Sequence, residues 1–332
     1  MPVVGETRVF RNGSWQRLGR GDLGASEFIL GTTEPSDANV GVGIIRTAPT
    51  TVINGNVTVN AGQTVVDRII NGLVDIEVGG ILENCIVRGP AVEPTSSRPL
   101  VRVNGHTPTP GGTRAIIRYC EIRPQTPSAF TDAIGYKGYY AYRCNIRDTT
   151  DAFAVFSTTE EGLVNVLVEG CYVPRLVQWR PDYAYPGGRS HTHNDVVQFQ
   201  NNQGDTNDAI FTGNSFNARF VDYAGTQPLE NVRKHAAAVM VTPFSPRTGI
   251  PEPKVSATFN QNWFKGGEWT VNAGSDNNKF LGQIIFTDNR FERPGTVADA
   301  PMVALAIDSD YPHMVSGNTY IDNGATVNIS TA

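Results

Sequence analysis

The segment Ile81-Leu-Glu-Asn-Cys85-Ile-Val87 contains the pattern that decides the fold of this chain. One apolar residue stands three positions before the cysteine, and another stands two positions after it. The other three cysteines of the 332-residue chain have the same surroundings. Their segments are Ile116-Ile-Arg-Tyr-Cys120-Glu-Ile122, Tyr140-Ala-Tyr-Arg-Cys144-Asn-Ile146 and Leu167-Val-Glu-Gly-Cys171-Tyr-Val173.

The pattern continues toward the C-terminus with asparagine in place of cysteine. The four further copies are centred on Asn214, Asn262, Asn289 and Asn318. All sixteen flanking positions of the eight copies are apolar, although only 39% of the chain is apolar, so chance is a poor explanation. The eight Cys and Asn positions are called the ladder positions below.

Successive ladder positions are between 24 residues (Cys120 to Cys144) and 48 residues (Asn214 to Asn262) apart. A minimum spacing with irregular additions is typical of a solenoid whose coils share one girth and carry loops of variable length. Short β-branched and aromatic runs between Gly, Asn and Asp turns indicate strands. Stacked strands lie roughly 4.8 Å apart, so one residue type can repeat along the stack. The sequence therefore predicts an all-β chain wound as a parallel β-helix.

The four cysteines are expected to form a buried, reduced ladder of small side chains in this β-helix. A structural metal site is disfavoured because no C-x-x-C pair is present. Disulfide bonds and metal binding remain the alternatives for these residues.

Composition and charge exclude several classes of protein. The net charge is −5, which argues against a basic nucleic-acid binder. The chain contains no run of 18 apolar residues and is therefore not expected to span a membrane. Its first ten residues have neither a basic n-region nor an apolar h-region, so no secretory signal peptide is predicted.

A second strand is predicted between successive ladder positions, and several of these strands begin with an acidic residue. Aligned on their apolar residues, Asp132, Asp151 and Asp195 form one column, with His235 as its next member. Carboxylates about 5–10 Å apart on stacked strands cover both glycosidase geometries, and like charges separate their pKa values as an acid/base pair requires. Corner capping at strand starts is the alternative. The parity of the apolar residues that follow also directs the column inward.

Two histidines stand just before Asp195. On a strand, His191 and His193 would share a face. With Asp195 they could bind a metal, or His193 could act as an acid/base group oriented by a carboxylate. A polar turn held by His–Asp hydrogen bonds is the simpler alternative, and no metal or other cofactor is predicted. Gln198 and Gln200 have outward parity and could hydrogen-bond sugar hydroxyls.

An aromatic and Arg-rich excursion precedes these histidines. Its rings and guanidinium groups could provide stacking platforms for sugar rings. Packing against the coil or a neighbouring subunit is an equally simple explanation. The predicted substrate-binding residues are His191, Gln198, Gln200, Trp179, Arg180, Tyr183, Tyr185 and His235.

Several segments carry a family resemblance. Residues from about 50 to 332 resemble a right-handed parallel β-helix of the pectate-lyase type. The motif His191-Thr-His193-Asn-Asp195-Val-Val-Gln198-Phe-Gln200, followed by Phe211-Thr-Gly-Asn214, is similar to phage and actinobacterial members of that group. The region from Thr50-Thr-Val-Ile53 to Ile86-Val-Arg-Gly-Pro90 resembles the start of tail spikes and minor tail proteins of actinobacterial phages. Arg8-Val-Phe-Arg-Asn-Gly-Ser-Trp15 and Thr33-Glu-Pro-Ser-Asp37 resemble their short attachment segments.

This resemblance implies a right-handed, single-stranded parallel β-helix with residues 1–45 as an N-terminal attachment segment and 46–332 as a glycan-binding domain. It implies a homotrimer in the phage tail that joins other tail proteins through its N-terminus and binds host cell-wall or capsular polysaccharide. Some such proteins also cleave the glycan, as glycoside hydrolases or polysaccharide lyases. The candidate catalytic residues are Asp195, His193, Asp151 and Asp132.

Two other functions stay open. In a non-catalytic tail adhesin, the Asp column would be structural and the loops would bind glycan or pack the trimer. A bacterial polysaccharide lyase of the pectate-lyase-like group is the third possibility, and the missing secretory signal counts against it.

Overall fold

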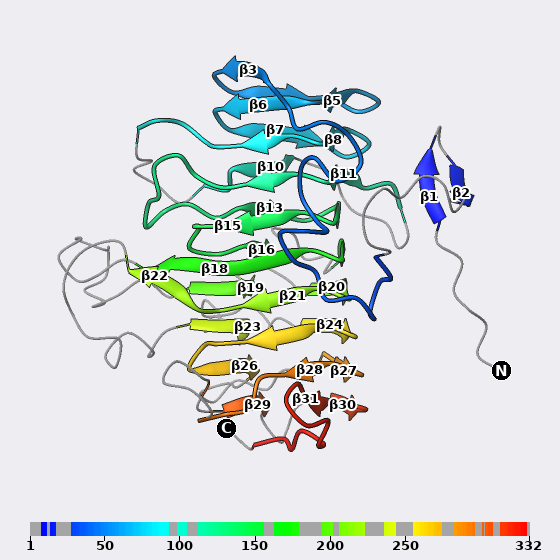
Figure 1. Cartoon of the computed structure of the whole chain (residues 1–332), viewed down its shortest axis with the longest axis vertical. Helices are drawn as coiled ribbons and strands as arrows, with labels where there is room; N and C mark the ends of the chain where they lie inside the picture. The colour runs from blue at the N-terminus through cyan, green and yellow to red at the C-terminus, as the bar shows by residue number, and fades with distance from the viewer. Residues whose placement is uncertain are drawn as a thin grey trace, which may run out of the picture.

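The chain winds into a stack of coils whose strands form three parallel sheets (Figure 1). The computed structural model describes residues 8–11, 14–17, 28–92, 98–104, 112–155, 163–178, 194–201, 206–222, 236–243, 255–273, 282–295, 301, 303–307 and 313–330. Apart from the short strand β22 (Phe220–Asp222), each coil contributes one strand to each sheet in turn. The predicted all-β, right-handed, single-stranded parallel β-helix is confirmed.

The three sheets are numbered in the order in which a coil passes through them after strand β3. Sheet 1 contains β4 (Val57–Val59), β7 (Val74–Glu77), β10 (Val101–Asn104), β13 (Ile134–Tyr136), β16 (Phe153–Val155), β19 (Asn194–Asn201), β23 (Ala236–Pro243), β26 (Trp269–Ala273) and β29 (Val303–Ile307). Sheet 2 contains β5 (Thr64–Val66), β8 (Ile81–Glu83), β11 (Ala115–Arg118), β14 (Tyr139–Tyr142), β17 (Leu163–Glu169), β20 (Thr206–Thr212), β24 (Val255–Asn260), β27 (Ile284–Thr287) and β30 (His313–Ser316). Sheet 3 contains β3 (Thr51–Asn54), β6 (Arg68–Asn71), β9 (Ile86–Val87), β12 (Glu121–Ile122), β15 (Asn145–Arg147), β18 (Tyr172–Gln178), β21 (Ser215–Asn217), β25 (Trp263–Lys265), β28 (Arg290–Phe291) and β31 (Thr319–Tyr320), while β22 pairs with β18 beside it.

A separate antiparallel hairpin lies near the N-terminus, formed by β1 (Arg8–Arg11) and β2 (Ser14–Arg17). No helix of the described residues is long and apolar enough to cross a membrane.

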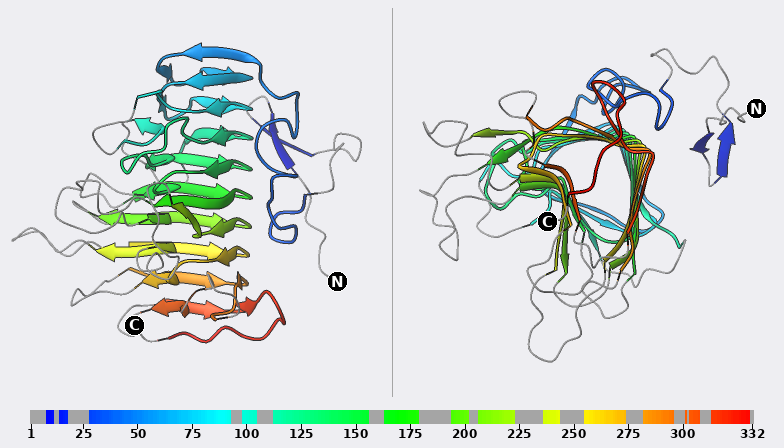
Figure 2. Two further views of the ribbon diagram at one scale, coloured as in Figure 1. Left: turned by 60° about the vertical axis from the view of Figure 1, so that its left-hand side comes forward. Right: turned by 90° about the horizontal axis from the view of Figure 1, so that it is seen from below.

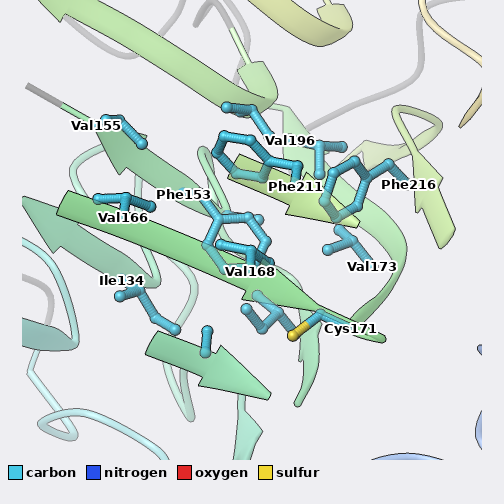
Figure 3. Close-up of a cluster of buried hydrophobic side chains, with 14 of the residues drawn as sticks. Ile134, Phe153, Val155, Val166, Val168, Cys171, Val173, Val196, Phe211 and Phe216 are labelled. Atoms are coloured by element: carbon cyan, nitrogen blue, oxygen red, sulfur yellow. The ribbon is translucent and has the colours of Figure 1, made fainter. Parts of the chain in front are cut away.

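The core lies inside the stack, where alternate residues of all three sheets converge. Viewed along the axis in Figure 2 (right), the strands of successive coils superpose around one interior. Figure 3 shows Phe153 from sheet 1, Val168 and Phe211 from sheet 2, and Val173 and Phe216 from sheet 3 meeting there, all fully buried. In strands such as β10 and β24, buried and partly exposed residues alternate, and this alternation favours one register.

Sheets 2 and 3 meet at a turn of two residues in each of the eight coils that carry a ladder position. The first residue of the turn has a positive φ, between 49° and 67°, and the second is the ladder residue. Left-handed backbone favours Gly and Asn, yet Tyr119 and Arg143 also adopt it here. The tight turn directs every ladder side chain inward, and all eight are buried.

The asparagine ladder is a continuous chain of hydrogen bonds. The side-chain amide of Asn262 donates to Oδ1 of Asn289 at 3.0 Å and to the carbonyl oxygen of Phe211 at 3.0 Å. Its own Oδ1 accepts from the backbone N–H and the side chain of Asn214. Asn289 and Asn318 repeat the arrangement one coil further on. Each asparagine therefore satisfies backbone groups of a neighbouring coil that would otherwise be buried without partners.

The cysteine ladder uses thiols for the same purpose. Cys120 Sγ donates to the carbonyl oxygen of Leu82 at 3.6 Å, and Cys144 Sγ donates to that of Ile117 at 3.4 Å. These carbonyl groups stand three positions before the preceding ladder residue, as that of Phe211 does for Asn262. All four cysteines are free and buried, which confirms the predicted reduced ladder.

Aromatic rings form a second set of ladders in the C-terminal half. Phe259 stacks between Phe211, at a centroid distance of 4.9 Å, and Phe286, at 4.7 Å. The interplanar angles are only 10° and 8°, because the three residues occupy identical positions on adjacent strands of sheet 2.

Residues 28–48, called the strap below, lie on the outside of the solenoid along the corner between sheets 2 and 3 (blue in Figure 1). The backbone N–H of Gly41 donates to the carbonyl oxygen of Arg143, and Asn84 exchanges hydrogen bonds with Gly43 and Thr47. Most of the strap falls before residue 46, where the sequence places the start of the β-helix. The role of residues 1–45 in attachment stays a prediction.

Candidate functional site

The long connections of the chain flank the strands of sheet 1. Within the β-helix, gaps of more than ten residues separate β9 from β10, β12 from β13, β18 from β19, β22 from β23, β23 from β24 and β28 from β29. By contrast, every turn from sheet 2 to sheet 3 at a ladder position has two residues. Because variable loops on a rigid scaffold are where binding groups concentrate, sheet 1 and its two edges are the candidate functional region.

The predicted Asp column lies at the edge of sheet 1 that follows sheet 3. Ile134, Phe153 and Val197 are register partners on adjacent strands, so Asp132 and Asp151, each two positions before its partner, align with Asp195. The structure therefore confirms that three consecutive coils place a carboxylate at one position. All three are buried, with exposed fractions of 8%, 6% and 0%.

Hydrogen bonds tie the carboxylates to the next coil. Asp151 Oδ1 accepts from the backbone N–H of Asp195 at 2.8 Å, and Asp195 Oδ1 accepts from that of Ala237 at 3.0 Å. Asp132 Oδ1 accepts from the Thr150 hydroxyl at 3.1 Å. These contacts are those of the capping alternative, in which Asp side chains satisfy backbone groups where strands begin.

The electrostatics of the column disfavour full ionisation. Burial raises the pKa of Asp151 well above its usual range, and the nearby charges of Asp132 and Asp195 raise it further. The hydrogen bond from the Asp195 N–H opposes this shift. A protonated central carboxyl between two other acids has the property that a general acid requires.

The prediction that His235 is the fourth member of the Asp column is wrong. Asp195 pairs with Ala237 across sheet 1, so the register excludes His235, two residues earlier, from the position opposite Asp195. His235 itself lies outside the described residues.

One of the two glutamines predicted to point outward, Gln198, is more buried than expected. Gln198 lies between Ala154 and Met240 in the register of sheet 1, and its side chain is only 8% exposed. Although Gln198 has outward parity, its side chain is therefore not open to a ligand as predicted. Gln200 belongs to β19 and its backbone pairs with Thr242, while its side chain is not among those described.

The remaining candidate residues lie outside the described residues, so their roles stay predictions. They are Trp179, Arg180, Tyr183, Tyr185, His191 and His193. Within the described ranges, no group of three His, Cys, Asp or Glu side chains is placed to hold a metal ion.

Sequence reasoning missed a charged cluster on the outer face of sheet 1. Asp75 Oδ1 accepts from Arg102 Nε at 2.8 Å, and Asp75 Oδ2 accepts from Arg98 at 3.0 Å. Arg102 pairs in register with Gly135, which pairs with Ala154, so small residues separate this cluster from Gln198. The alternation Val101-Arg102-Val103 could have identified Arg102 as an outward cation.

Trp269 was also missed as a surface feature. It begins β26 and is 40% exposed, which is unusual for a large aromatic residue in the described part of the chain. The sequence shows only that a strand begins at Trp269. Its exposure could not be predicted, because the burial of a residue at a corner depends on the neighbouring coils.

No protein-family model matches the chain, and no curated protein matches it.

Proposed function

We propose that this chain is a phage tail spike or minor tail protein whose β-helix binds host cell-wall or capsular polysaccharide along sheet 1. The observation that carries the proposal is the distribution of variable connections. They flank sheet 1, whereas the opposite corner is a uniform turn covered in part by the strap. A rigid sheet edged with variable loops suits an extended ligand with a repeating structure.

The outer face of sheet 1 supplies suitable chemistry for sugars. Arg102 and Arg98 could hydrogen-bond hydroxyl or carboxylate groups, and the small residues Gly135 and Ala154 leave the backbone close to the surface of the sheet. Other tail proteins would bind the N-terminal segment, and the assembled form would be a homotrimer.

A binding assay tests this proposal. Fluorescently labelled host-surface polysaccharides are titrated with the full chain and with Arg102→Ala. A weakening of binding by about ten- to a hundredfold is expected, since a lost charged hydrogen bond typically costs about 1.5–3 kcal/mol. Arg293→Ala is the matched control, because Arg293 follows β28 of sheet 3 and pairs with Asp322 on the last coil, several coils away from Arg102. Equal loss in both variants, or no binding by the wild-type chain, would contradict the proposal.

Cleavage is a second candidate function, favoured by the raised pKa of Asp151 beside Asp132 and Asp195. The burial and capping hydrogen bonds of the column instead support the non-catalytic adhesin. Release of reducing ends by the wild type without new C=C absorbance, abolished in Asp195→Asn and Asp151→Asn, would establish hydrolysis. Binding without release would favour the adhesin, and new C=C absorbance on an acidic glycan would favour the lyase.

A further inference from the structure

The strap begins halfway along the solenoid. The guanidinium of Arg143 lies over the ring of Phe28, 4.4 Å from its centroid. Gly170 of the next coil approaches the same ring so closely that a Cβ there would lie 2.9 Å from it. Both Arg143 and Gly170 are first residues of the two-residue turns, in the middle of the stack.

From Phe28 the strap runs toward the C-terminal coils. A Cβ on Gly213 would lie 2.7 Å from the backbone nitrogen of Gly31, and the carbonyl oxygen of Gly31 accepts from Arg290 at 3.2 Å. Glu34 Oε1 then accepts from Ser215 at 2.9 Å and from Lys265 at 2.5 Å. The strap therefore reaches the coil of Arg290.

The strap then turns back toward the first coils. Asp37 accepts hydrogen bonds from Asn145, at 2.7 Å, and from Arg147. The carbonyl oxygen of Asn39 accepts from Nε of Arg143 at 3.1 Å. Further on, Arg46 pairs with Glu83 at 2.6 Å.

These contacts join coils that do not touch one another. In a solenoid each coil contacts only its neighbours, so separation of one pair of coils is opposed only locally. The strap binds the coils from Glu83 to Arg290 to one continuous segment. We propose that residues 28–48 are a staple that holds the coils together. Because the staple begins at Phe28, in the middle of the stack, the chain before Phe28 tethers the solenoid from its side and not from its first coil.

Hydrogen–deuterium exchange tests the staple in the full chain. The variant combines Phe28→Ala, Glu34→Gln and Asp37→Asn, all on the strap. Amides of the turns at Arg143, Gly170, Gly213 and Gln261 are expected to exchange at least about tenfold faster, as expected when opening costs 1.4 kcal/mol less. The turn at Gly317 is an internal control, because it has the same geometry and, within the described residues, no hydrogen bond or ion pair to the strap. Unchanged exchange, or equal acceleration in all turns, would overturn the staple.

Spin-label distances test the side tether. A label at Ile29→Cys, on an exposed residue beside Phe28, is paired with one at Thr51→Cys on the first coil or at Asn323→Cys beyond the last strand. The buried native thiols are not expected to take the label. A tether at the middle predicts similar distances for the two pairs, roughly half of the stack length each. A distance from Ile29 to Thr51 much shorter than that from Ile29 to Asn323 would show an exit at the end of the stack and overturn the side tether.

Discussion

The side-chain oxygen of Asn214 accepts a hydrogen bond from the backbone N–H of Cys171 at 2.8 Å. This contact joins the cysteine half of the ladder to the asparagine half. One coil earlier, Cys171 Sγ accepts from the N–H of Cys144 at 3.4 Å, so sulfur and amide oxygen fill the same role. The two residue types are alternatives for one structural task, and they differ in the strength of the bonds they make.

Asn262→Ala should destabilise the protein by about 3 kcal/mol, because buried groups of Asn214, Phe211 and Asn289 would lose their partner. Asn262→Cys should cost roughly half of that, since a thiol can still donate to the Phe211 carbonyl. Denaturant unfolding measures both values. Equal losses would show that cysteine cannot replace asparagine at a ladder position.

The four native thiols should not react with Ellman's reagent in the folded protein. All four are fully buried, which denies the reagent access, and burial is also the main reason why the pKa of Cys85 is raised to about 11, so that little of this thiol is thiolate. All four should react once the protein is unfolded in guanidinium chloride. Thr51→Cys, on an exposed residue, provides a positive control that reacts at once. Rapid labelling of a native cysteine would contradict the buried ladder.

Asp151→Asn should stabilise the protein at pH 7 and have little effect at pH 4. The raised pKa of folded Asp151 means that its contribution to stability is complete below the unfolded pKa, about 3.9, and is lost as pH rises toward the folded pKa. Asparagine removes this penalty and keeps an acceptor oxygen for the Asp195 N–H. Melting temperatures at both pH values provide the measurement.

Asp322→Asn is the control with the opposite sign. Arg293 lowers the pKa of this exposed carboxyl, so its small contribution is present at neutral pH and lost on acidification. Stabilisation of Asp151→Asn at pH 4 as large as at pH 7 would show that the charge of Asp151 is not the cause.

Phe259→Leu should destabilise the protein by about 1–2 kcal/mol more than Phe286→Leu. Phe259 loses two stacked neighbours, Phe211 and Phe286, whereas Phe286 stacks only on Phe259 in the same column. Both side chains are fully buried, so the volume lost is the same. Identical unfolding free energies for the two variants would mean that stacking adds nothing beyond burial.

The core of the fold could be predicted because its period is local. Leu82 and Val87 flank Cys85 as Phe286 and Phe291 flank Asn289, and inward residues must repeat when strands stack in register. The same reasoning placed Asp132, Asp151 and Asp195 in one column.

The errors have a physical cause as well. His235 was aligned with Asp195 by a shift of two residues, and such a shift keeps every inward side chain inward, so the apolar pattern cannot detect it. Gln198 has outward parity and is nevertheless buried. Parity predicts only which way a side chain points, and it does not predict how far neighbouring residues cover that side chain. The strap could not be predicted because its sequence has no repeat. Its residues Glu34 and Asp37 have their partners more than a hundred residues away.

The uniform two-residue corner also limits how such a chain can change in length. An extra residue there would turn the ladder side chain out of the interior and break its hydrogen bonds to the coils before and after it. A whole coil, such as the 27 residues from Asn262 to Asn289, could be duplicated or removed, and each ladder residue would still lie next to a ladder residue of the adjacent coil. The molecule is therefore expected to grow or shrink over evolution in entire coils, while its other two corners accept inserts of any size.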